Sequence, residues 1–70
     1  MHSATLETSD RLQRVDKLLS DGREYSTLDI VTGAQVCAVN SIIAELRDNG
    51  RQITCQRRGR YWYCRMVGVQ

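Results

Sequence analysis

The sequence predicts an α+β fold in which three helices are followed by an antiparallel hairpin. Apolar residues recur at helical spacing as far as residue 49, and the period then changes from about 3.6 residues to about 2. With 70 residues and no proline, repeat or low-complexity stretch, the chain has room for one domain and shows no linker. We therefore expect a partly disordered arm at residues 1–8, a folded domain at 9–67 and a tail at 68–70.

The first helix is expected to begin near residue 9, where Ser9 or Thr8 can cap it. Gly22 follows the apolar pattern and can adopt the left-handed conformation that commonly closes a helix. Charged side chains occupy the opposite face, as in an amphipathic helix packed on a core. The inward face is predicted to consist of Leu12, Val15, Leu18 and Leu19.

A short extended segment and a second helix are expected next. The stretch REYS at residues 23–26 is long enough for one extended turn, with Tyr25 as the residue that packs. Ser26 and Asp29 have the spacing of a capping box, in which each side chain accepts a hydrogen bond from a backbone N–H at the helix start. We expect this helix at residues 27–32, and its predicted buried side chains are Leu28 and Val31.

Gly33 is predicted to interrupt the second helix, because glycine readily takes the positive φ that a sharp turn between helices requires. A third helix should then run over residues 35–49 and end at Asn49 and Gly50. Its predicted inward face consists of Val39, Ile42, Ile43 and Leu46.

The hairpin after Gly50 should place its apolar side chains on one face. A two-residue loop made of Arg58 and Gly59 gives such a register, and a four-residue loop would keep it. This register pairs Arg57 with Arg60, Cys55 with Trp62, and Ile53 with Cys64. Trp62 is predicted to be part of the core. Cys55 and Cys64 are predicted to be small buried apolar residues, and a cross-strand disulfide between them is the alternative.

Charge is distributed unevenly along the chain. Residues 1–29 carry four basic and six acidic side chains, whereas residues 30–70 carry six arginines and two acidic side chains. The C-terminal half is therefore the expected contact for a polyanion. Its use of arginine favours phosphate, because a planar guanidinium binds phosphate with two hydrogen bonds.

Three stretches, STLDIVTG, SIIAELRDNGRQI and RRGRYWYCRM, occur in this order within residues 12–67. Together with the order of the elements, they resemble the small winged helix-turn-helix DNA-binding domains that are often encoded by phages and prophages. The resemblance implies a three-helix winged helix-turn-helix with a C-terminal wing of two or three antiparallel strands. It also implies duplex DNA binding by a small transcription regulator or accessory factor, with the third helix in the major groove and the hairpin tip on the backbone or minor groove.

Candidate DNA contacts fall into two groups. Outward side chains of the third helix could read bases, since Gln and Asn can each bond adenine twice and Ala can touch a thymine methyl group. Arginines at the hairpin tip could clamp phosphates or enter the minor groove. The alternative is that all these positions are merely solvated. The candidates are Gln35, Cys37, Ala38, Asn40, Ser41 and Arg47 on the helix, and Arg57, Arg58 and Arg60 at the tip.

No catalytic, metal or cofactor site is predicted, and we expect a protein that is not an enzyme. His2 is isolated, and Cys37, Cys55 and Cys64 lack the spacing of metal ligands. No apolar stretch approaches the ~20 residues of a membrane span, and the N-terminus lacks the pattern of a signal peptide. The expected location is the cytoplasm, with no membrane partner and no small-molecule substrate.

Double-stranded DNA is the expected partner. One recognition helix covers a short site, so useful specificity is expected to need a homodimer or tandem binding on DNA. Two other interpretations stay open. A winged helix can serve as a protein–protein interaction module, and Tyr61 and Tyr63 could stack on the bases of a single strand.

Overall fold

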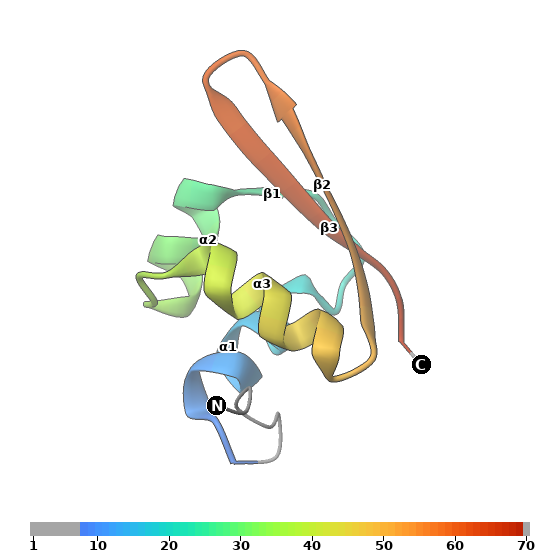
Figure 1. Cartoon of the computed structure of the whole chain (residues 1–70). Helices are drawn as coiled ribbons and strands as arrows, with labels where there is room; N and C mark the ends of the chain where they lie inside the picture. Colours follow the sequence, from blue (N-terminus) through green and yellow to red (C-terminus); the bar gives the residue numbers. More distant parts are fainter. Residues whose placement is uncertain (1–7, 70) are drawn as a thin grey trace.

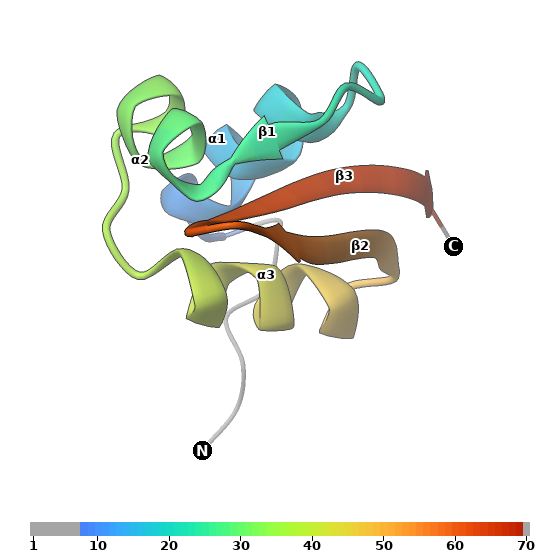
Figure 2. The ribbon, with the colours of Figure 1, turned by 90° about the horizontal axis from the view of Figure 1, so that it is seen from above.

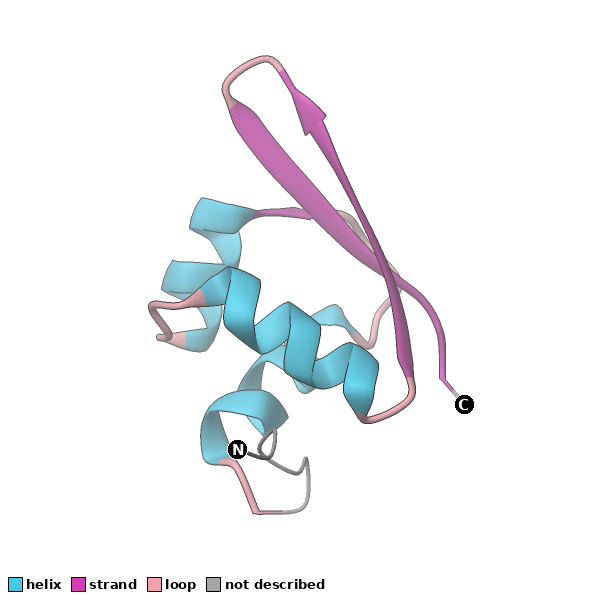
Figure 3. Cartoon of the chain, in the orientation of Figure 1, coloured by secondary structure: helices cyan, strands magenta, loops and turns pink. Residues whose placement is uncertain are grey.

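The computed structural model describes residues 8–69, and the predicted arm at 1–8 lies outside them except for Thr8. The chain forms three helices and a three-stranded antiparallel sheet with the strand order β1-β3-β2 (Figures 1 and 3). The α+β prediction is therefore confirmed. In chain order the elements are α1 (Asp10–Leu19), β1 (Tyr25–Ser26), α2 (Thr27–Ala34), α3 (Val39–Asp48), β2 (Arg51–Arg58) and β3 (Tyr61–Val69).

Helix α1 begins and ends as its sequence predicts. The Ser9 hydroxyl accepts a hydrogen bond from the backbone N–H of Leu12 at 3.4 Å, which caps the helix start. Gly22 has a φ of 76°, and its N–H donates to the carbonyl of Leu19 at 3.1 Å. Leu12, Val15 and Leu19 are buried, as expected, so α1 presents its apolar face to the core.

The capping box at the start of α2 is also confirmed, but the buried face of this helix differs from the prediction. The side chains of Ser26 and Asp29 each accept from the backbone N–H of the other residue. Ile30 and Ala34, one turn apart, are buried. Leu28 is 63% exposed, so the prediction that it is buried is wrong. Residues two positions apart face different sides of a helix, and burial of Ile30 therefore turns Leu28 outward.

The turn between α2 and α3 begins two residues later than predicted. Gly33 lies inside α2, where an added Cβ would come within 3.3 Å of a Leu18 methyl group. The left-handed residue is Gln35, with a φ of 55°, and the next N–H, of Val36, donates back to Val31. Val36 is buried and anchors the turn. Residues 35–38 are therefore turn rather than helix, and α3 starts at Val39.

One core joins the helices to the sheet. In Figure 2, α3 lies beside β2, and β1 leads into α2 on the other side of β3. Two ion pairs fasten α1 to its neighbours: Arg11 donates to Glu45 of α3, and Arg51 of β2 donates to Asp16 at 2.7 and 3.3 Å. The buried residues are Leu12, Val15, Leu19, Ile30, Ala34, Val36, Val39, Ile42, Ile43, Leu46, Ile53, Cys64 and Met66, which include the whole predicted inward face of α3.

The register of the hairpin differs from the predicted one. Its loop consists of Gly59 and Arg60, so that Arg58 pairs with Tyr61. Gly59 has a φ of 64°, and a two-residue loop with glycine first needs a positive φ only at that glycine. The predicted loop would have placed glycine second and forced Arg58 into the unfavourable region. The observed pairs are Arg57 with Trp62, Cys55 with Cys64, and Ile53 with Met66.

This register brings two cysteines directly opposite each other, and they form a disulfide. The Cα atoms of Cys55 and Cys64 are 4.1 Å apart, as in the close pairs of an antiparallel ladder. The prediction of two separate buried thiols is therefore wrong, and the alternative is correct. Cys37 is an exposed free thiol.

Strand β3 extends further than predicted. Gly68 and Val69, which we assigned to a tail, pair with Gln52 and Arg51 of β2. An added Cβ on Gly68 would come within 2.6 Å of Oε1 of Gln52, the flexible end of that side chain, which would have to move aside. The sheet therefore continues to residue 69, the last described position.

Candidate nucleic-acid interface

The wing, defined as residues 51–69 of β2, β3 and their loop, carries its arginines at the end that projects beyond the helices (Figure 1). Arg57, Arg58 and Arg60 are all exposed there. Nε of Arg57 donates to the carbonyl of Gly59 at 3.0 Å, which leaves its charge unneutralised. Arg58 pairs with Glu24 and lies 4.2 Å from the centre of the Tyr63 ring. Within residues 8–69 the Arg60 side chain has no partner, so Arg57 and Arg60 offer the freer positive charges.

The outer face of α3 offers small and polar groups beside the wing. Asn40, Ser41 and Ala44 are exposed, while the opposite face of the helix is buried. Of the other predicted helix contacts, Gln35, Cys37 and Ala38 are exposed but belong to the preceding turn. Ala38 occupies the N-cap position of α3 and makes no side-chain capping hydrogen bond. The fold thus brings the predicted candidates to the turn, the start of α3 and the wing tip.

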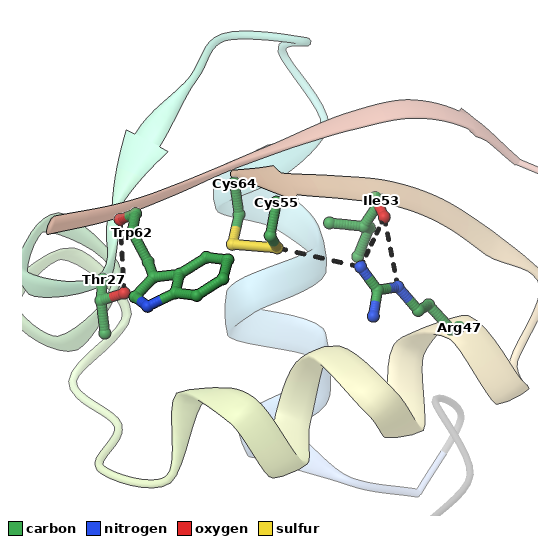
Figure 4. The surroundings of a disulfide bond; sticks show 6 residues. All are labelled: Thr27, Arg47, Ile53, Cys55, Trp62 and Cys64. Carbon is green, nitrogen blue, oxygen red and sulfur yellow. Dashed lines mark hydrogen bonds between the residues drawn. A yellow bond between two sulfur atoms is a disulfide. The ribbon is translucent and has the colours of Figure 1, made fainter. Parts of the chain in front are cut away.

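Arg47, predicted as a DNA contact, is exposed and also makes contacts within the domain. Its Nε and Nη2 donate to the carbonyl of Ile53 at 3.2 and 2.8 Å, and Nη2 lies 3.9 Å from Sγ of Cys55 (Figure 4). The side chain therefore joins the end of α3 to β2. Two of its nitrogens are already used in holding the helix against the wing.

A cleft of about 460 Å³ lies between α3 and the wing. Apolar groups and the disulfide form one part of its lining, and an amide, a hydroxyl and a guanidinium form the other. Figure 4 shows the Trp62 indole between the wing and α3, close to Thr27, with the disulfide beside it. The lining residues are Thr27, Asn40, Ile43, Arg47, Cys55, Trp62 and Cys64.

Trp62 is 51% exposed, so its predicted place in the core is wrong. It shares a face of β3 with Cys64 and Met66, which are both buried. Trp62 is nearer the tip, opposite Arg57, where the helices no longer cover the sheet fully. The sequence pattern identified its face but not how far the hairpin projects. Thr27, whose hydroxyl donates to the Trp62 carbonyl at 3.4 Å, was also missed, because only the fold brings it there.

The perturbed pKa values belong to groups outside this interface. A hydrogen bond from the Tyr25 hydroxyl to the Asp21 carboxylate lowers the pKa of Asp21 and raises that of Tyr25. The hydrogen bond from Arg51 to Asp16 raises the pKa of Arg51. These shifts accompany contacts within the body of the domain.

Comparison with known proteins does not assign a function to this site. We compared the chain with protein families, curated proteins and solved structures, and found no match. Among residues 8–69, no group of three metal-ligating side chains is close enough to hold an ion. No single helix in the same range has the length and apolar content to cross a membrane, although α2 and α3 pass that test as a pair bent by 84°.

Proposed function

We propose that this protein is a winged helix-turn-helix that binds duplex DNA. Helix α3 lies in the major groove, and the wing tip contacts the backbone or the minor groove. The observation that carries this proposal is the projection of three exposed arginines at the wing tip beside the exposed polar face of α3. A major groove about 12 Å wide accommodates one helix, and a flanking arginine loop can then reach the phosphates.

In this proposal, the start of α3 contacts the bases and the wing tip contacts the phosphates. Gln35, in the turn before α3, can form two hydrogen bonds with adenine, and Ser41 can bond a base or a phosphate. Ala38 and Ala44 have small side chains, which let the helix approach the base edges closely. The tip arginines contribute affinity that is independent of sequence, because phosphates are the same along the whole duplex.

A titration followed by fluorescence anisotropy tests the proposal. A labelled duplex of mixed sequence should bind at low salt, and its affinity should fall as salt rises, with a log–log slope of about −0.9 for each neutralised phosphate. Changing Arg57, Arg58 and Arg60 together to alanine should weaken binding to all sequences. No binding at low salt, or binding indifferent to salt, contradicts the proposal.

Arg60→Ala and Arg23→Ala form a matched pair for this test. Both arginines are exposed and have no side-chain hydrogen bond or ion pair within the described part of the chain, but Arg23 lies in the loop between α1 and β1. Only Arg60→Ala should reduce the salt slope. An equal effect of both changes would indicate general charge attraction rather than a wing contact.

A cytoplasmic location belongs to this proposal, and it makes the Cys55–Cys64 disulfide relevant to the assay. Thiols keep most cytoplasmic cysteines reduced, whereas the structure has these two joined. The titration is therefore run on the oxidised protein and again after reduction with a dithiol. DNA binding by either form supports the proposal.

A protein–protein interaction module is the second candidate. It is favoured by apolar side chains on the surface, since Leu28 of α2 is 63% exposed and Val67 of β3 is 48% exposed. Amide chemical shifts recorded while duplex DNA is added separate the two candidates. Shifts in residues 35–47 and 57–60 favour DNA binding, and unchanged shifts there favour the protein partner.

A further inference from the structure

The cleft between α3 and the wing leaves a large aromatic surface open to a ligand. Trp62 is 51% exposed although Cys64 and Met66, on the same face of β3, are only 4% and 8% exposed. The cleft volume of about 460 Å³ falls in the range of small-ligand sites. Such sites combine apolar and aromatic walls with a few polar groups, which is also the composition of this cleft.

The polar groups of the cleft are suited to the edge of a planar heterocycle. The side chain of Asn40 has no hydrogen bond to any residue within 8–69, so both its amide and its carbonyl can bind a ligand. Arg47 is held in place by the Ile53 carbonyl through Nε and Nη2, and Nη1 makes no hydrogen bond within the described chain. An indole for stacking and a free carboxamide for hydrogen bonding together fit a nucleobase.

The position of the cleft indicates where such a base would come from. The cleft separates the two surfaces that contact DNA in the proposed function, so a strand reaching from α3 to the wing tip passes its mouth. We infer that the cleft receives one unstacked nucleobase of the bound DNA, which stacks on Trp62 and is hydrogen-bonded by Asn40. This inference rests on the proposed function.

The inference predicts a preference for DNA that contains an unpaired base. Moving a base out of an intact duplex costs unstacking and unpairing energy, and the cost is lowest for a base that is already unpaired. Stacking on an aromatic side chain then contributes to affinity. The gain corresponds to a factor of about five or more in the dissociation constant.

Two labelled duplexes, one fully paired and one with a single bulged adenine, provide the experiment. Trp62 is the only tryptophan of the chain, so its fluorescence reports directly on the cleft. The bulged duplex should bind at least about fivefold more tightly and should quench Trp62 more strongly than the paired one. Equal affinities, or equal quenching by the two duplexes, would overturn the inference.

Variants separate stacking in the cleft from a general effect of an aromatic wing. Trp62→Ala should lose the preference for the bulge while still binding the paired duplex, and Trp62→Phe should keep the preference. Tyr61→Ala is the control, since Tyr61 is 55% exposed near the tip but does not line the cleft. A preference that survives Trp62→Ala, or that disappears in Tyr61→Ala, would count against the cleft.

Failure of the inference can be distinguished from failure of the proposed function. Binding of the paired duplex tests the function alone. If that duplex does not bind, adenosine monophosphate is titrated and the Trp62 emission is recorded. Saturable quenching that Asn40→Ala weakens supports a nucleobase site, and unchanged emission overturns it.

Discussion

The helical body and the wing tip of this small domain are held together in different ways. In the body, apolar side chains from all three helices and the sheet form one buried core, and ion pairs such as Arg51–Asp16 join its elements. At the tip, the side chains of residues 57–62 are exposed. The strands there are held by ladder hydrogen bonds, by the pair between Arg58 and Glu24, and by the Cys55–Cys64 disulfide where the hairpin meets the core. The body thus depends on packing, whereas the tip depends on a few specific links.

This difference separates stability from binding. A change in the body should alter the free energy of unfolding, because it removes buried apolar contacts. A change among the exposed tip arginines should alter contacts with a partner and leave stability nearly unchanged. Paired changes in the body and at the tip test whether this separation holds.

The largest effect is expected for truncation of the core. Leu46 is fully buried, and Leu46→Ala should lower the free energy of unfolding by about 2–5 kcal/mol in urea denaturation. Leu28→Ala removes the same atoms from a side chain that is 63% exposed, and its effect should be within about 0.5 kcal/mol. Similar losses in the two variants would show that α2 is packed differently.

Reduction of the disulfide should have the next largest effect. Opening the Cys55–Cys64 bond with a dithiol frees the unfolded chain and should cost roughly 2–4 kcal/mol, measured as a lower urea midpoint. Cys55→Ala combined with Cys64→Ala removes the bond and should make stability insensitive to the dithiol. A wild-type midpoint unchanged by reduction would show that the wing does not depend on this link.

Arg47 and Arg60 sharpen the comparison because one serves the body and the other the tip. Arg47→Ala removes two hydrogen bonds to Ile53 and should cost about 1–2 kcal/mol of stability. The dependence of DNA affinity on salt should be the same for Arg47→Ala as for the wild type. Arg60→Ala should leave stability unchanged and reduce the slope by about 0.9. The reverse result would make Arg47 the phosphate contact.

The smallest effect concerns pH and the hydrogen bond from Tyr25 to Asp21. The pKa of Asp21 is lowered from 3.8, so its contribution is present above that value and is lost as pH falls through the lowered pKa. The pKa of Tyr25 is raised from 10.0, so its contribution is present below that value and is lost as pH rises through the raised pKa. Asp21→Asn should remove both effects in thermal unfolding measured across pH. Unchanged pH dependence in this variant would exclude the bond as their source.

Local chemistry made part of this structure predictable. The caps at Ser9 and Ser26 depend on residues within one helical turn, and the inward face of α3 depends on spacing alone. Gly33 misled the prediction because its role depends on Leu18, which is distant in sequence. The hairpin register depends on which loop position has a positive φ, and Gly59 is at that position. The same register places Cys55 opposite Cys64.

The positive charge of the candidate site could be predicted from the sequence, but its cleft could not. The tip arginines follow from composition and from a glycine turn, and the structure leaves them exposed. The half-open Trp62 and the link from Arg47 to Ile53 depend on where the hairpin lies relative to α3, which no local pattern specifies. Tertiary placement therefore exposes Trp62, a predicted core residue, and lets Arg47, a predicted contact, also join α3 to β2.

The disulfide has a practical consequence for handling the protein. The bond between Cys55 and Cys64 closes a covalent ring, and this ring contains Arg57, Arg58 and Arg60. Trypsin cutting after any of these arginines leaves both fragments attached, so the chain keeps nearly its full mass on a non-reducing gel. The nick becomes visible only after a thiol is added, and a sample that looks intact can therefore carry a severed tip.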